Sequence, residues 1–292
     1  MLQFTNTALA GLVLGMIFAA FALALVLIWR STRILNFAQA PMAVLTTYIA
    51  LVMIEDGRPY WLAFVVALLA GLVLGAVLER VVIRPVEGKP DINAVILTLG
   101  LFIVFKSGAE VIFGTKLRTY PPTFGIRGIE IGDTTIGITT SDFFTIGAVV
   151  ATLVLLVALF RFTDLGLKMR AAANNQEVAG LLGVKVGAML TLGWALAAVV
   201  GSLSGLLIAA GGLVQPSYMD SIVVFGFIAA VIGGLESPAG AVVGGLLLGF
   251  SLSFVSGYLS AQLVALVALG ILMTVLTVRP GGLFAATQGR RV

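Results

Sequence analysis

The stretch LAFVVALLAGLVLGAV, residues 62–77, carries no charged or polar side chain on any face. A helix on the surface of a soluble protein keeps a polar face, and a transmembrane barrel strand alternates apolar and polar residues, so neither fits this stretch. The 292-residue chain contains several apolar runs of about 20 residues, the length with which an α-helix crosses a bilayer. With 10% charged residues and a mean hydropathy of +1.15, these runs predict an all-α, polytopic membrane protein.

Similar apolar runs lie on both sides of this stretch, and they predict one helical bundle of about eight to ten transmembrane segments over residues 1–292. The region 221–255 leaves two interpretations open, because a polar break at residues 233–238 interrupts it. It is either two spans joined by a tight turn or one span with a broken half-helix. The other segments are expected at residues 7–29, 34–54, 60–83, 92–113, 143–160, 187–214 and 261–278.

The distribution of Lys and Arg predicts the orientation of these segments. No basic residue precedes the first segment, whereas Arg30 and Arg33 follow it, so the positive-inside rule places the N-terminus outside and the C-terminus inside. Alternation of sides then makes residues 114–142 the largest external loop and residues 161–186 a cytoplasmic loop. Alternating isoleucines around Gly132-Asp133 predict a small β-hairpin in the external loop. They are Ile129, Ile131, Ile136 and Ile138.

Histidine and cysteine are both absent, which removes His/Cys zinc sites, disulfides, Ser-His-Asp triads and thiol nucleophiles. We therefore expect no catalytic residue, no metal site and no cofactor bound by this chain. The Gly88-Lys89 pair is followed by Pro90, so it is no phosphate-binding loop, and the chain is not expected to hydrolyse ATP. The net charge of +4 is attributed to cytoplasmic loops rather than to a nucleic-acid partner.

Residues 161–186, RFTDLGLKMRAAANNQEVAGLLGVKV, form a polar island between two long apolar blocks. Asn174, followed three residues later by Glu177, resembles a capping box, and Gly183 can end a helix in a left-handed conformation. These signals predict a helix of about two turns that begins near Asn175. A helix this short needs a surface to pack against, and a partner protein is favoured over the lipid surface. The apolar residues on one side of it are Val178, Leu181 and Leu182.

Two polar breaks in the membrane segments are candidates for the solute pathway. Asn36 and Gln39 enter the second segment, and Glu236 and Ser237 precede Pro238. Unwound backbone and half-helix ends at membrane depth hold polar ligand groups in many transporters, while a plain interfacial loop is the alternative.

Two weaker patterns concern packing. Lys106 and Glu110 lie four residues apart, so they can pair on one helix face. The endings VVIRPVEG, residues 81–88, and VLTVRPGG, residues 275–282, each follow a polar break by about 45 residues. They suggest two structural halves in parallel orientation, with chance similarity among Leu/Val/Gly-rich segments as the alternative.

The island and the two breaks together resemble a known family. Glu177 to Gly183, EVAGLLG, resembles the Glu-Ala-Ala-x-x-x-Gly loop of ABC importer permeases, with Val in place of the first Ala. The surrounding GLKMRAAANNQEVAGLLGV, together with LNFAQ at residues 35–39 and GGLESPAGAVVGG at residues 233–245, resembles the branched-chain amino acid permease subunits of the LivH type. The resemblance covers essentially the whole chain, and three motifs in the same order make it specific.

The resemblance implies a permease subunit of a bacterial ABC importer in the inner membrane, which moves branched-chain or other hydrophobic amino acids by ATP-driven alternating access. The implied partners are a homologous second permease subunit in a heterodimer, two cytoplasmic ATPase subunits that bind ATP and Mg, a periplasmic or lipid-anchored solute-binding protein, and membrane lipids. Residues 161–186 would be the coupling loop that docks in an ATPase. The residues to which that role is carried are Glu177, Ala179 and Gly183, with Arg170 and Asn174 as supports.

One departure from the family leaves the solute open. LNFAQ continues with Ala40-Pro41-Met42, where many relatives are expected to have Gly and an acidic residue. Urea or short-chain amides are therefore alternative solutes for the same architecture. A membrane channel is a rival of a different class, although the chain has no evident filter ring or Arg-rich voltage-sensing helix.

Overall fold

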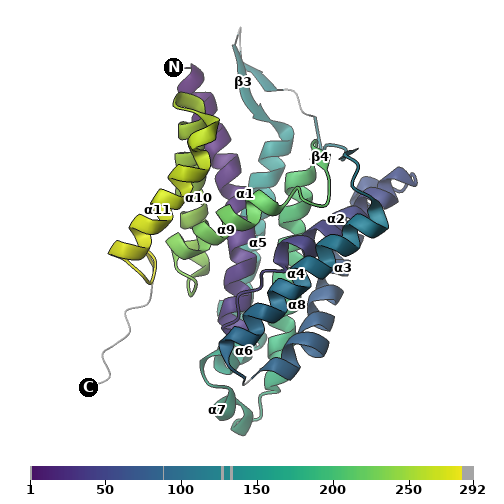
Figure 1. Cartoon of the computed structure of the whole chain (residues 1–292), viewed down its shortest axis with the longest axis vertical. Helices are drawn as coiled ribbons and strands as arrows, with labels where there is room; N and C mark the ends of the chain where they lie inside the picture. The colour runs from purple at the N-terminus through teal and green to yellow at the C-terminus, as the bar shows by residue number, and fades with distance from the viewer. Residues whose placement is uncertain (1, 88, 126–127, 132–133, 285–292) are drawn as a thin grey trace.

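The computed structural model describes residues 2–87, 89–125, 128–131 and 134–284. Within those ranges, seven helices are long and apolar enough to cross a membrane, and two shorter apolar helices accompany them (Figure 1). The predicted all-α polytopic architecture is therefore confirmed. The long helices are α1 (Leu2–Thr32), α3 (Tyr60–Leu78) with its π-helical extension (Glu79–Ile83), α4 (Asp91–Phe113), α5 (Thr140–Phe162), α8 (Val186–Ala209), α10 (Pro238–Tyr258) and α11 (Val264–Val278) with the short turn before it (Ala261–Leu263). The shorter helices are α2 (Gln39–Glu55) and α9 (Asp220–Gly233).

The interrupted region 221–255 has a tight turn, as one interpretation expects, and a half-length helix, as the other expects. It forms two helices, α9 and α10, that are joined by a turn at residues 234–237. With 14 residues, α9 is about 21 Å long at 1.5 Å per residue, shorter than the hydrocarbon core of about 30 Å. The first of the two helices is thus a half-length helix, and the second is a full span.

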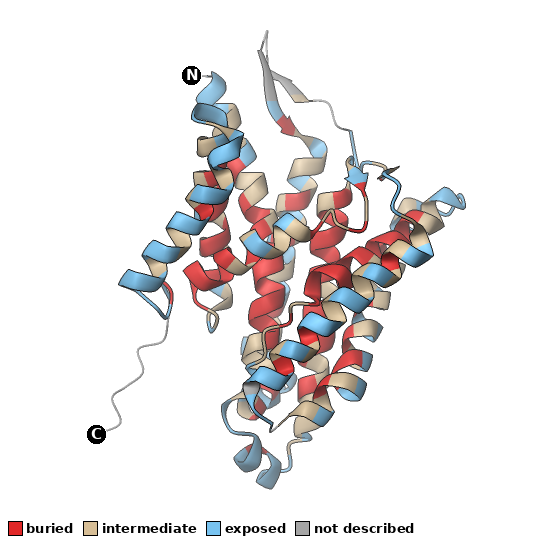
Figure 2. Cartoon of the chain, viewed as in Figure 1, coloured by how far each residue is buried: buried red, intermediate tan, exposed pale blue. Residues whose placement is uncertain are grey.

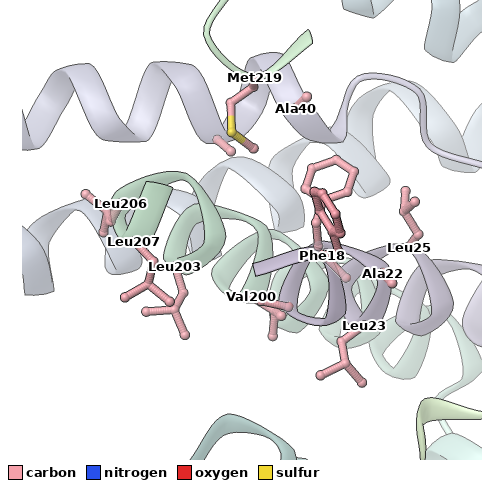
Figure 3. Packing of buried hydrophobic residues seen from close by; sticks show 14 of the residues in the cluster. Phe18, Ala22, Leu23, Leu25, Ala40, Val200, Leu203, Leu206, Leu207 and Met219 are labelled. Carbon is pink, nitrogen blue, oxygen red and sulfur yellow. The ribbon is translucent and has the colours of Figure 1, made fainter. Parts of the chain in front are cut away.

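The centre of the bundle is an antiparallel pair of helices, α1 and α8, whose most apolar windows are both 78% buried. The indole Nε1 of Trp194, near the start of α8, donates a hydrogen bond to Thr32 Oγ1, near the end of α1, so the two helices run in opposite directions. Buried side chains of α1, α2 and α8 pack with Met219 into one core (Figure 3). In contrast, α4, α5 and α11 lie outside this centre and are largely exposed (Figure 2).

The helices fall into two halves. The sequence predicted that these halves run parallel to each other, and this prediction is wrong. In each half a long central helix is followed by a short helix and then by a third helix, which gives α1, α2 and α3 in one half and α8, α9 and α10 in the other. Helix α1 packs most extensively against α10, and α8 against α3, so each third helix covers the central helix of the other half. Because α1 and α8 are antiparallel, these halves are related by an inversion of direction.

Small residues let α1 and α10 pack with their backbones in contact. A Cβ atom added to Gly249 would lie 2.3 Å from the Cα atom of Gly15, and one added to Gly245 would lie 2.5 Å from the backbone nitrogen of Ala19. Real side chains do not approach backbone this closely, so these positions require glycine. Gly245 and Gly249 are four residues apart, and this Gly-x-x-x-Gly spacing thus serves helix packing.

We expect Gly249→Ala to destabilise the protein by about 1–3 kcal/mol, because the added methyl group forces α1 and α10 apart. Gly100→Ala in α4 is the matched control, since its Cβ atom would meet nothing within 4 Å. There the same change is expected to stabilise the helix by roughly 0.5–1 kcal/mol. Thermal unfolding of the two detergent-purified variants measures this difference, and equal melting temperatures would contradict the packing role.

The end of the bundle that holds the start of α1 also holds the long loop between α4 and α5 (Figure 1). The predicted hairpin is present as β2 (Gly128–Ile131) and β3 (Thr134–Thr139), which pair in antiparallel register with Ile129 opposite Ile136. Its turn residues, Gly132 and Asp133, lie outside the described residues. The short strands β1 (Arg118–Thr119) and β4 (Leu213–Val214) tie this loop to the chain after α8.

Lys106 does not pair with Glu110, as its spacing in the sequence suggested. Its Nζ atom lies 2.5 Å from the Oδ2 atom of Asp220, in the first turn of α9. The carboxylate of Asp220 also faces the partial positive charge of the helix N-terminus, which stabilises it there. The ion pair therefore joins α4 to the short helix α9.

Candidate functional site

The polar island lies at the end of the bundle opposite the start of α1 and forms two helices, α6 (Asp164–Asn174) and α7 (Gln176–Leu181) (Figure 1). The sequence analysis missed α6. Its local signal is Thr163, whose side chain accepts a hydrogen bond from the backbone N–H of Gly166 at 3.0 Å and so caps the helix. A Cβ atom on Gly166 would lie 2.1 Å from the carbonyl oxygen of Leu159, so the sharp turn from α5 into α6 requires glycine.

The short helix α7 has the predicted length and end but a different cap. The side chain of Asn175 accepts the hydrogen bond from the Val178 N–H at 3.0 Å, while Asn174 is the last residue of α6, so the capping box assigned to Asn174 is wrong. Gly183 has φ of +81°, as expected. Hydrogen bonds from the Gly183 N–H to Gly180 O and from the Val184 N–H to Ala179 O, both 3.0 Å, complete a Schellman motif.

One side of α7 is apolar and uncovered within the described chain. Leu181 is 84% exposed and Leu182 is 78% exposed, and Val178 is also exposed. Ala179, on the other side, is buried, whereas Glu177 in the first turn is exposed. The exposed side chains of Val178, Leu181 and Leu182 form a small apolar surface, here called the apolar knob, between the Asn175 cap and the Gly183 turn.

A cavity of about 350 Å³ lies beside α6, between the end of α1, the start of α8 and the turn from α9 to α10. It brings together residues that the sequence assigned to different roles, because Arg170 and Asn174 from the coupling set share it with Glu236 from the pathway set. Glu236 forms an ion pair with Arg33, from the segment after α1. The lining residues are Leu27, Arg30, Ser31, Arg33, Phe160, Met169, Arg170, Ala173, Asn174, Met189, Leu190 and Glu236.

Asn36 and Gln39 are both buried, and they do not line this cavity. The Asn36 Nδ2 group donates to Gln39 Oε1 at 3.1 Å, and its Oδ1 atom accepts from the Ala38 N–H at 3.0 Å. The Gln39 Nε2 group donates to the carbonyl oxygen of Ala197 in α8 at 3.0 Å. This network fixes the start of α2 against α8.

Ser237 has a local role in the second break. Its hydroxyl oxygen accepts a hydrogen bond from the Gly240 N–H at 2.9 Å, and Pro238 occupies the first position of α10. A serine cap followed by proline is a strong signal for a helix start. It therefore fixes where the full span begins after the short helix.

A buried charged cluster beside the island was not singled out in the sequence. Glu79 has a fully buried side chain in the π-helical extension of α3, and its carboxylate accepts hydrogen bonds from Arg84 at 2.9–3.1 Å. Thr191 Oγ1 donates to Glu79 Oε2 at 2.5 Å, and the Arg84 guanidinium donates to the Gly187 carbonyl oxygen at 2.6 Å. The cluster joins the end of α3 to the first turns of α8. The sequence signal that could have revealed this cluster is a glutamate at the end of an apolar run, with an arginine five residues later.

These features define a multi-pass membrane protein with an inverted pair of helical halves and a short exposed helix with an apolar side, as expected of a transport permease. A family model described as the branched-chain amino acid transport system permease component matches residues 7–277, and the chain belongs to this family. The match runs from α1 into α11 and includes the island.

Curated relatives align over nearly their full length. The high-affinity branched-chain amino acid transport system permease protein LivH of Salmonella typhimurium is 26% identical, with 100% of this chain and 98% of the relative covered. The corresponding permease protein BraD of Pseudomonas aeruginosa is 25% identical, with 97% and 96% covered. Among solved structures, PsaBC from Streptococcus pneumoniae in complex with Fab has a TM-score of 0.48 at 15% identity and covers 94% of this chain and 91% of that chain.

Proposed function

We propose that this chain is the permease subunit of a bacterial ABC importer that moves branched-chain or other hydrophobic amino acids across the inner membrane. The observation that carries the proposal is the uncovered apolar knob of α7, held by the Asn175 cap and the Gly183 turn. The family and its amino acid permeases support the solute class. Transport is driven by ATP, and ATP and Mg are bound by partner subunits.

The partners follow from the same proposal. Two cytoplasmic ATPase subunits receive the coupling loops, a homologous second permease completes a heterodimer, and a periplasmic or lipid-anchored binding protein delivers solute to residues 114–142. The N-terminus lies outside and the C-terminus inside, and lipids cover the exposed outer helices. The coupling residues are Arg170, Asn174, Glu177, Ala179 and Gly183.

Contacts that connect α7 to the membrane helices support ATP-driven alternating access in this proposal. When the ATPases close, they displace α7, and the chain leads from there directly into the first turn of α8. Arg84 and Glu79 bind that turn to the end of α3, so the displacement moves α3 with α8. Helix α6 packs on α1, α5 and α8, and it carries the same displacement to the central pair.

The test is uptake by proteoliposomes that contain the complete transporter. We expect ATP-dependent accumulation of labelled leucine and little accumulation of labelled urea or acetamide. Preferred uptake of urea or acetamide would reassign the solute. Ion currents from this chain purified alone and placed in a bilayer would replace the importer with a channel.

We also propose that Asn36, Gln39, Glu236 and Ser237 lie near the solute pathway, because each stands at a break in a membrane segment. Asn36→Ala and Glu236→Ala are expected to change the apparent leucine affinity or rate of uptake about tenfold while the amount of folded protein stays within twofold. Asn93→Ala, an exposed amide at the start of α4, is the control. Unchanged uptake kinetics in both test variants would leave these residues with structural roles only.

A further inference from the structure

The cavity beside α6 has an unusual combination of charges. Three guanidinium groups line it, from Arg30, Arg33 and Arg170, and they face one carboxylate, that of Glu236. Among the described residues, Arg30 and Arg170 form no ion pair, and the Arg33 guanidinium pairs with the Oε1 atom of Glu236 and lies over the Trp29 ring. The second carboxylate oxygen, Oε2, accepts no hydrogen bond in the described part of the chain. The cavity thus offers two unpaired cationic donors and one free anionic acceptor.

One part of the remaining wall of the cavity is apolar, while Ser31 and Asn174 add polar groups to it. Met169 and Leu190 are buried side chains, and Leu27 of α1 lies beside them with 3% of its surface exposed. Phe160 holds the Arg30 guanidinium over its ring at 5.6 Å, which fixes the direction of that charge. Methionine side chains adapt their shape, so this wall can accept aliphatic groups of different branching.

We propose that this cavity is a binding site for an α-amino acid with an aliphatic side chain, and this proposal rests on the proposed function. Arg30 and Arg170 bind its α-carboxylate, and the free Oε2 atom of Glu236 binds its α-ammonium group. The side chain lies against Leu27, Met169 and Leu190. A volume of about 350 Å³ falls within the range of roughly 300–1,000 Å³ that is usual for small-molecule sites.

The charge pattern favours a zwitterion over a simple anion. The carboxylate of Glu236 repels phosphate, and the apolar side chains of Leu27, Met169 and Leu190 offer phosphate no hydrogen bond. Two cationic groups opposite one anionic group match the carboxylate and ammonium of an amino acid, and charged hydrogen bonds of this kind fix orientation.

In the orientation proposed above, the cavity lies on the cytoplasmic side, next to the helix that leads into the docking helix. An amino acid bound there links α6 to the end of α1 and to the turn between α9 and α10. Imported solute that occupies the site therefore opposes displacement of α6. Binding of solute and displacement of α6 oppose each other, so we expect solute that accumulates on the cytoplasmic side to slow ATP-driven uptake.

The binding experiment uses the complete transporter without its binding protein, in nanodiscs of phosphatidylcholine. Leucine is titrated beside leucinamide, which lacks the carboxylate, and 4-methylpentanoate, which lacks the ammonium group. We expect leucine to bind and each analogue to bind about tenfold more weakly. Equal binding of all three, or displacement of leucine by inorganic phosphate at equal concentration, would overturn the zwitterion site. Loss of leucine binding in nanodiscs that contain phosphatidylglycerol would instead assign the cavity to a lipid headgroup.

Variants locate the binding in this cavity. Arg30→Gln is expected to weaken leucine binding about tenfold, while Arg58→Gln, an exposed arginine in the α2–α3 loop, leaves it unchanged. Glu236→Gln should weaken leucine but not 4-methylpentanoate, a selective change that misfolding does not produce. Leucine binding that is unaffected by both cavity variants would overturn the proposal.

The uptake assay separates this inference from the proposed function. If ATP-dependent leucine uptake occurs but leucine on the cytoplasmic side neither binds nor slows it, only the cavity site fails. If the complete transporter accumulates no leucine at all, the proposed function itself fails.

Discussion

Replacing Gly183 with valine is expected to abolish solute uptake and co-purification of the ATPase subunits while the permease remains in the membrane. Gly183 has φ of +81°, a conformation in which a β-branched residue is strained by about 1–3 kcal/mol. A helix of six residues has little stability of its own, so this strain unwinds its last turn and displaces Leu181 and Leu182. Uptake in proteoliposomes and affinity purification of the assembled transporter measure the loss, which we expect to exceed about tenfold.

Gly57→Val is the matched control for this experiment. Gly57 has φ of +80°, and a Cβ atom at either glycine would meet nothing within 4 Å, so the two substitutions impose the same backbone strain in open space. Gly57 lies just after α2, in the loop to α3, at the end of the bundle away from α7 (Figure 1). We expect normal uptake and normal ATPase binding there. If Gly183→Val also retained both, the coupling role of α7 would be refuted.

Arg84→Met is expected to destabilise the folded protein by about 3–5 kcal/mol, because it leaves the carboxylate of Glu79 buried without its partner. Glu79 is fully buried, whereas the Arg84 side chain is 34% exposed and can reach water. The two partners are therefore unequal, and Glu79→Gln, which keeps a hydrogen-bonding group beside Thr191, should cost only about 1–3 kcal/mol. Thermal unfolding of the purified variants compares them.

The double variant Glu79→Leu with Arg84→Met tests the cause of this loss. Replacing both charges removes the unpaired carboxylate, so much of the stability lost in Arg84→Met should return. Glu55→Gln, which breaks the partly exposed ion pair with Arg118, is the control and should change stability by less than about 1 kcal/mol. Equal effects of Arg84→Met and Glu55→Gln would show that burial of Glu79 does not govern the cluster.

The double variant also separates stability from coupling. Even with stability restored, it lacks the hydrogen bond from Arg84 to the Gly187 carbonyl oxygen, which holds the first turn of α8 to α3. We therefore expect the double variant to be folded and to bind ATPases, with slower uptake for each ATP hydrolysed. Such uncoupling would identify the cluster as the link between the docking helix and the bundle.

The sequence by itself determined the features that depend on short stretches of chain. The length of each apolar run sets where a helix can satisfy its backbone hydrogen bonds inside a bilayer, so most membrane segments were predictable. Gly183 marked the end of α7 because glycine adopts positive φ without steric cost. The isoleucine alternation likewise identified the hairpin, whose register pairs Ile129 with Ile136. These signals act over a few residues, and a single chain displays them directly.

Only the tertiary structure decided which distant groups meet. Lys106 had an acceptable partner one helical turn away, yet the fold brings the carboxylate of Asp220, at the start of α9, to its ammonium group. The inverted direction of the two halves likewise depends on how α1 and α8 cross. Arg30, Arg170 and Glu236 converge on one cavity although they are far apart in sequence. Apolar patterning fixes where helices form, but their mutual rotation and direction arise from close packing of complete side-chain surfaces.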